Sequence, residues 1–142
     1  MEIDARGPRF SAIITTIVLA LALVTSSMWL LLAQALVFAV GAVAGLRYAP
    51  YGLVYRSLVR PRLGPPSRFE PEAPPRFAQG VGLVFAAIGV IGYAAGVTGL
   101  GIAFTAMALA AAFLNAAFDF CLGCQMYLFI RRIWPSSPSA AA

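Results

Sequence analysis

Long apolar runs dominate the pattern of hydrophobic and polar positions along the chain. Four of them approach or reach the length of a membrane-spanning helix: Phe10 to Thr25, Met28 to Leu46, Val81 to Val97 and Leu100 to Phe120. A helix needs roughly 20 apolar residues, within a range of about 17 to 25, to cross the hydrocarbon core of a bilayer. The pattern therefore predicts an all-α membrane protein with four transmembrane helices.

The composition agrees with a single membrane domain. The chain has 142 residues and is 61% hydrophobic, which is too apolar for a water-soluble domain and too short for a second domain. We expect one transmembrane domain over residues 1–142, with a disordered low-complexity tail at 136–142. A cleaved signal peptide is disfavoured, because Glu2 and Asp4 stand at the start and no clear small-residue cleavage site follows the first run.

The basic residues are all arginines, and they gather on one side of the predicted membrane. They precede the first run, fill the stretch between the second and third runs, and follow the fourth, giving a formal net charge of +5. The positive-inside rule predicts cytoplasmic N- and C-termini in a multi-pass protein of the inner (plasma) membrane. We expect a lipid bilayer and no nucleic acid as partner, because arginines beside membrane spans are more simply explained by topology and anionic lipid.

A short motif marks the start of each half of the chain. Pro8-Arg9-Phe10 opens the first half, and Pro75-Arg76-Phe77 opens the second. After each pair of runs, a glycine is followed by a tyrosine three or four residues later, and then by arginine and proline. We interpret this pattern as a tandem duplication of a two-helix unit. The alternative is a chance similarity between two membrane hairpins.

The duplication sets the expected boundaries within the domain. Repeat 1 covers residues 8–61 and repeat 2 covers residues 75–135, each with a short interfacial helix after its second span. A proline-rich cytosolic linker at 62–74 joins them, because its prolines exclude a regular helix. Since each repeat has an even number of spans, both copies insert in the same orientation. The prediction is a four-helix bundle made of two parallel-repeat hairpins.

The candidate chemistry lies where the fourth run ends. Cys121 and Cys124 are the only cysteines, and two thiols at this spacing can form a disulfide if Gly123 lets the backbone turn. If a new interfacial helix starts near Leu122, Cys121 lies at its N-terminus, where the thiolate is favoured. Cys121 is then the nucleophile and Cys124 the resolving thiol. A purely structural role for both cysteines stays open, since cysteine often packs as a small hydrophobe.

An acidic residue stands close to this pair. Asp119 lies inside an apolar run, where a charge costs about 2.5 to 3.5 kcal/mol at the bilayer centre and less near the edge, so it is a candidate site residue. Asn115 lies one helical turn earlier and is a candidate hydrogen-bond partner. Asp119 reaches the thiols only if the helix breaks at Gly123. Otherwise we expect it to pair with Arg9 or Arg76.

Several kinds of chemistry are disfavoured. The chain has no histidine, which removes Ser-His-Asp catalysis and histidine-ligated haem. Two thiols fill only half of a tetrahedral metal site unless two subunits share an ion. No glycine-rich phosphate loop is present in the sequence. We therefore expect no metal and no cofactor.

Four segments together resemble a known family: Ile3 to Phe10, Pro75 to Gln79, Asn115 to Phe118 and Phe120 to Tyr127. The family is an uncharacterised integral membrane protein family, common in actinobacteria and classed as domain of unknown function 4395. The resemblance covers nearly the whole chain, and the Cys-Leu-Gly-Cys motif is its most specific part. It implies association with thioredoxin-like or sulfurtransferase proteins, and hence a thiol or sulfur role for the cysteines.

The leading hypothesis is thiol-disulfide or sulfur transfer with a soluble thioredoxin-like or rhodanese-like partner. Cys121 attacks, Cys124 resolves, and Asp119 with Asn115 tunes protonation. A reducing cytosol predicts a dithiol at rest. The second hypothesis is a non-catalytic scaffold or accessory subunit that binds through the linker and the interfacial helix. The third is a small-molecule transporter, and homo-oligomer formation stays open for all of them.

Overall fold

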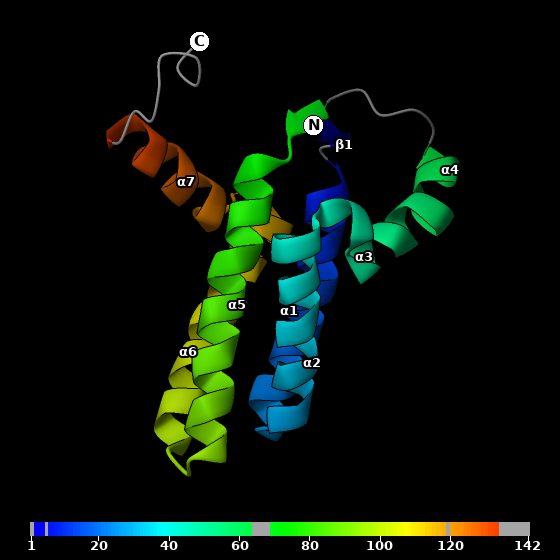
Figure 1. The fold of residues 1–142 in the computed structure, drawn as a ribbon. Helices are drawn as coiled ribbons and strands as arrows, with labels where there is room; N and C mark the ends of the chain where they lie inside the picture. Colours follow the sequence, from blue (N-terminus) through cyan, green and yellow to red (C-terminus); the bar gives the residue numbers. More distant parts are fainter. Residues whose placement is uncertain (1, 5, 64–68, 119, 134–142) are drawn as a thin grey trace.

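The computed structural model describes residues 2–4, 6–63, 69–118 and 120–133. Helices account for most of these residues (Figure 1). The longer ones are α1 (Arg6–Thr25), α2 (Met28–Ala39), α5 (Ala73–Ala94), α6 (Thr98–Phe118) and α7 (Leu122–Ile133). The short elements are η1 (Val40–Ala44), η2 (Leu46–Tyr48), α3 (Pro50–Val54), η3 (Tyr55–Val59), α4 (Arg60–Leu63), β1 (Glu2–Asp4) and β2 (Phe69–Pro71).

Three helices, α1, α5 and α6, are long and apolar enough to cross a membrane. The continuous apolar helix made of α2 and η1, Met28–Ala44, falls short of that length. Many large apolar side chains on these helices are exposed, including Ile17, Val24 and Trp29. A water-soluble domain does not leave so much apolar surface uncovered, so the prediction of a helical membrane protein is confirmed at this level.

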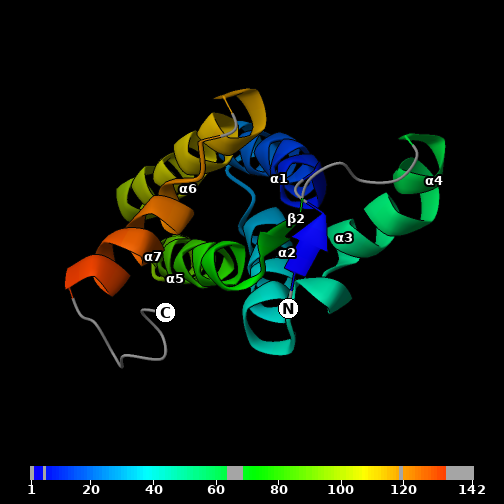
Figure 2. The same cartoon turned by 90° about the horizontal axis from the view of Figure 1, so that it is seen from above.

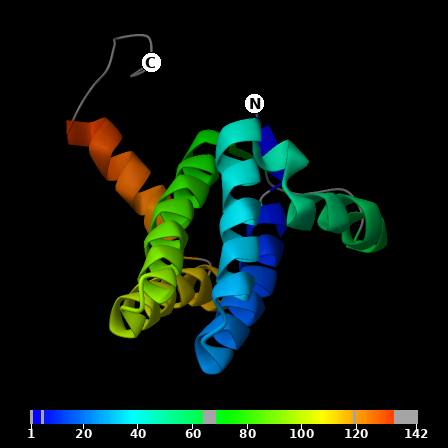
Figure 3. The same ribbon diagram turned by 60° about the horizontal axis from the view of Figure 1, so that its bottom comes forward.

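The two hairpins pack across one another (Figures 2 and 3). α1 packs mainly on α6 and α2 packs on α5, so the first helix of each hairpin lies against the second helix of the other. The buried core is formed by Leu19, Leu31, Phe38 and several alanines. The alanines let the helices approach closely around the larger side chains, which suits helix association driven by van der Waals packing.

Two arginines satisfy helix carbonyls across the hairpins. Arg9 Nε donates to the carbonyl oxygen of Ala116 at 3.1 Å. Arg76 donates from Nε to the oxygen of Ala42 at 2.8 Å and from Nη2 to the oxygen of Val43 at 2.7 Å. These carbonyls lie in the last turns of their helices, where no intrahelical partner remains. Each hairpin therefore supplies an arginine that caps the second helix of the other hairpin.

A second matching contact occurs at the same end of the molecule. The Phe10 and Tyr55 rings lie 5.5 Å apart at 48°, and the Phe77 and Tyr127 rings lie 5.6 Å apart at 55°. Each phenylalanine comes from a Pro-Arg-Phe motif, and each tyrosine comes from a helical segment that follows a hairpin. Those segments, η3 with its neighbours and α7, extend from one end of the packed helices toward opposite sides (Figures 1 and 2).

The stretch before α5 departs from the all-α prediction. β2 pairs antiparallel with β1, with Ile3 opposite Glu70, and so joins the N-terminal arm to the predicted linker. The strand pair is short, and Pro71 stands at the end of β2. Both features are expected beside prolines, because proline has no N–H to donate to a strand ladder. α5 also begins at Ala73, well before the predicted apolar run at Val81, because Pro74 and Pro75 are tolerated in a first helical turn.

Gly92 and Gly96, near the end of α5, have different roles. Gly92 is buried where α5 meets α6, and a Cβ built there would lie 2.7 Å from the backbone nitrogen of Gly101. Gly96 has a φ of +82°, and with nothing within 4 Å of such a Cβ it serves the turn between the helices. One glycine allows close approach and the other allows the chain to reverse.

Replacing Gly92 by alanine is expected to lower stability by about 1 to 3 kcal/mol, because the methyl group pushes against backbone of α6 that cannot move alone. Gly99→Ala is the matched control, since nothing lies within 4 Å of its Cβ position, and we expect a change within about 0.5 kcal/mol. Thermal unfolding in detergent measures both. Equal stability of the two variants would contradict the close packing of α5 on α6.

Candidate functional site

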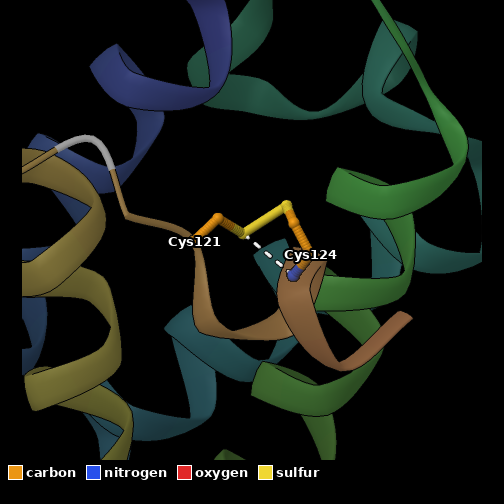
Figure 4. Close-up of a disulfide and its surroundings, with 2 residues drawn as sticks. All are labelled: Cys121 and Cys124. Carbon is orange, nitrogen blue, oxygen red and sulfur yellow. Dashed lines mark hydrogen bonds between the residues drawn. A yellow bond between two sulfur atoms is a disulfide. The ribbon is translucent and has the colours of Figure 1, made fainter. Parts of the chain in front are cut away.

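The two cysteines meet at the start of α7. Cys121 directly precedes the helix, Cys124 lies in its first turn, and a disulfide joins them with a Cα–Cα distance of 5.1 Å (Figure 4). The backbone N–H of Cys124 donates to Cys121 Sγ at 3.2 Å. The predicted helix start at Leu122 is confirmed. The structure holds the oxidised form of the pair, whereas the sequence predicts a dithiol at rest.

Gly123 has a different role from the predicted one. The helix is interrupted between Phe118 and Leu122, so the break that Asp119 would need to reach the thiols lies before Gly123 and not at it. Gly123 lies inside α7, and a Cβ built on it would lie 2.5 Å from Ala78 Cβ and 2.6 Å from Ala78 Cα. The missing side chain therefore lets α7 touch the backbone of α5. This contact fixes the disulfide beside the packed helices.

A cavity of about 580 Å³ lies between the helices and reaches this disulfide. Cys121 and Asn115 both line it, so the structure brings these two predicted site residues to one space. Most of the lining is apolar, with Phe38 and Phe85 among its larger side chains. The volume falls in the range of sites that hold small organic ligands, about 300 to 1,000 Å³.

A small number of polar groups face the same space. They come from four different elements, α1, α3, α5 and α6, and include Ser11, Tyr51, Gln79 and Asn115. A largely apolar pocket with a few hydrogen-bonding groups is the usual form of a small-molecule site. Among the residues that the structure describes, no group of three or more His, Cys, Asp or Glu side chains is placed to hold a metal ion.

Tyr51 is the most constrained of these polar groups. Its hydroxyl donates to Gln34 Oε1 at 2.7 Å, and Gln34 is buried in α2. Burial raises the pKa of the Tyr51 phenol, so the hydroxyl keeps its proton at neutral pH. Gln34 Nε2 is buried and has no hydrogen-bond partner within the described part of the chain. Tyr51, bonded to Gln34, therefore adds an uncharged polar side chain to one wall of the cavity.

The outer part of α7 is amphipathic. Tyr127 packs on Phe77 and accepts a hydrogen bond from Arg131 Nη1 at 2.8 Å. Four of its apolar side chains are exposed: Met126, which also lines the cavity, and Phe129, Ile130 and Ile133. These side chains give α7 the apolar face expected of a helix that lies at a membrane surface.

The remaining predicted contacts are partly outside the described residues. Asp119 lies outside them, so its proposed bonds to Asn115, Arg9 or Arg76 stay predictions. Arg76 Nη1 lies 3.5 Å from Glu72 Oε1, in addition to its bonds to carbonyls in the last turn before Gly45.

Sequence reasoning missed the cavity residues Ser11 and Gln79, because membrane hairpins carry such polar residues for many reasons. Tyr51 had a signal, since it stands in the first half where Cys121 to Cys124 stand in the second.

The comparisons with known proteins give one match. A family model described as Domain of unknown function (DUF4395) matches residues 3–132, which include both hairpins and both cysteines. A search of curated proteins and a search of solved structures find no match.

Gly123→Ala is expected to separate α7 from α5, because the new methyl group overlaps Ala78 backbone and side chain together. We expect a loss of about 1 to 3 kcal/mol in unfolding free energy and faster labelling of the reduced cysteines by a water-soluble maleimide. Gly80→Ala is the control on α5, since its Cβ would meet only Ala42 Cβ, at 3.9 Å. Wild-type labelling rates in Gly123→Ala would contradict this docking.

Proposed function

The chain belongs to the DUF4395 family, and from the position of its cysteine pair we propose that it exchanges electrons with a soluble thioredoxin-like protein by thiol-disulfide exchange. One observation carries the proposal: Cys121 Sγ lies at the N-terminus of α7, accepts the Cys124 N–H, and lines the central cavity. A sulfur placed only for packing needs neither the helix N-terminus nor the cavity.

The helix N-terminus decides the roles of the two sulfurs. Partial positive charge and free N–H groups there stabilise a thiolate, so the Cys121 thiol loses its proton more readily than an ordinary cysteine. In the reduced protein the Cys121 thiolate attacks a disulfide of the partner and forms a mixed disulfide. Cys124 then attacks Cys121 Sγ and releases the partner as a dithiol. The same steps in reverse let a partner dithiol reduce the Cys121–Cys124 disulfide.

Asn115 and Asp119 complete the proposed site. Asn115 lies in the last turn of α6 and lines the cavity beside Cys121. We place Asp119, in the chain between α6 and Cys121, as the group that accepts and returns the proton of the attacking thiol.

The proposed topology has four spans in two tandem hairpins of like orientation. Two paired observations support the duplication: the matching Phe–Tyr ring contacts and the reciprocal arginine–carbonyl bonds. With repeat 1 at 8–61, the linker at 62–74 and repeat 2 at 75–135, both termini and the cysteines lie on the cytoplasmic face of the inner membrane. The exposed apolar face of α7 would then rest at that surface.

Reduced thioredoxin is the probe for the exchange reaction. We expect it to reduce the Cys121–Cys124 disulfide of the purified protein, measured by alkylation of the released thiols. In the opposite direction, a Cys124→Ser variant incubated with oxidised thioredoxin should accumulate a mixed disulfide, because the Cys121 thiolate attacks the thioredoxin disulfide and the resolving thiol is missing. Cys121→Ser is the matched control and should trap much less. If thioredoxin neither reduces the disulfide nor forms a mixed disulfide, the exchange function is wrong and a non-catalytic scaffold role is favoured. A persulfide formed on the cysteines by a rhodanese-like donor would favour sulfur transfer.

Sidedness tests the proposed topology. In a Cys121→Ser, Cys124→Ser background, single cysteines are introduced as Ser57→Cys and Thr98→Cys, both at exposed positions. Four spans with cytoplasmic termini predict that an impermeant maleimide labels Thr98→Cys in intact spheroplasts and labels Ser57→Cys only after permeabilisation. The opposite pattern would contradict this topology and would mean either that α2 does not cross the membrane or that the four spans have the reverse orientation.

A further inference from the structure

We infer that the central cavity binds the head group of a membrane quinone, which accepts the two electrons of the reduced Cys121–Cys124 pair. The inference rests on the proposed function for its source of electrons. It adds the electron acceptor and the place where that acceptor binds.

The cavity has the size and lining that a quinone ring requires. Its volume is about 580 Å³, and apolar side chains such as Phe38, Phe85 and Met126 make up most of the wall. A flat ring with two carbonyl oxygens needs such walls on its faces and hydrogen-bond donors at its ends. Ser11, Gln79 and Asn115 supply donors from three different helices, α1, α5 and α6.

The position of the disulfide separates this reading from a lipid-filled space. Cys121 is both a member of a two-electron couple and part of the cavity wall. A lipid tail has no use for a redox-active sulfur or for amide donors. A quinone uses both, and it dissolves in the bilayer that surrounds these helices, so it reaches the cavity without entering water. Quinones are the terminal oxidants of other membrane thiol systems.

The reaction balances in atoms and electrons. The Cys121 thiolate adds to a ring carbon of the quinone and forms a carbon–sulfur bond. Cys124, as its thiolate, attacks Cys121 Sγ and forms the disulfide. The carbon–sulfur bond breaks, and its electron pair passes to the ring. The two protons of the original thiols end on the two oxygens, so one dithiol and one quinone give one disulfide and one hydroquinone.

Binding is tested on the disulfide form in lipid nanodiscs, with menadione and a short-chain ubiquinone as separate probes in titration calorimetry. Ala111 lines the cavity, and Ala111→Phe should weaken binding by about tenfold or more because the ring occupies ligand space. Ala103→Phe is the matched control, since Ala103 is exposed on the same helix, α6, and it should bind as wild type does. Ser11→Ala tests the same wall without added bulk and should weaken binding severalfold.

Electron transfer is tested separately under anaerobic conditions. The reduced protein should convert about one quinone per disulfide formed, and Cys121→Ser, Cys124→Ser should bind quinone without reducing it. These assays use no thioredoxin, so failure of the exchange reaction with thioredoxin leaves the quinone result readable. Equal binding by Ala111→Phe and Ala103→Phe, or no binding of either probe, would overturn the site. Oxidation that proceeds equally fast in Ala111→Phe would overturn the transfer step, because it would be free thiol chemistry in the bilayer.

Discussion

The structure depends on close helix packing, in which each helix of one hairpin lies against a helix of the other. α1 lies on α6 and α2 lies on α5 between the hairpins, and α5 also packs closely on α6 within the second hairpin. In a bilayer no water-driven force brings helices together, and van der Waals contact has to supply the attraction. That is why buried alanines and Gly92 lie at these interfaces, and why arginines rather than apolar side chains hold the exposed helix ends. Each arginine reaches across to the carbonyls of the other hairpin.

The same close packing positions the sulfur pair. α7 contacts α5 through Gly123 on Ala78 and Tyr127 on Phe77. These contacts set the position and direction of α7 relative to α5. The first turn of α7 then presents Cys121 Sγ to its own N–H groups on one side and to the cavity on the other. Two different environments therefore act on one atom. The partial positive charge of a helix N-terminus favours a thiolate, and the cavity borders the same residue.

Much of this arrangement could be predicted from the sequence, and the failures have physical causes. Apolar runs of sufficient length identify membrane helices because few alternatives satisfy the backbone in lipid. A helix start near Leu122 was the condition for placing Cys121 at a helix N-terminus, and α7 meets it. The assignment of Gly123 to a backbone turn failed because a glycine in a Cys-x-x-Cys motif serves a turn or a close contact equally well. Only the position of Ala78 decides between them. The early start of α5 was missed because hydropathy does not register a polar first turn.

The cavity could not be predicted, and its origin explains why. It lies between the two halves at the end where η3 and α7 leave the packed helices, and residues from both halves line it. Its wall combines residues far apart in the chain, so no local pattern in the sequence encodes the space. Pro50 to Gly52 follows the first pair of helices, and Cys121 to Cys124 follows the second pair. The pocket is thus two-sided: the first half of the chain supplies Ser11 and Tyr51, and the second half supplies Cys121.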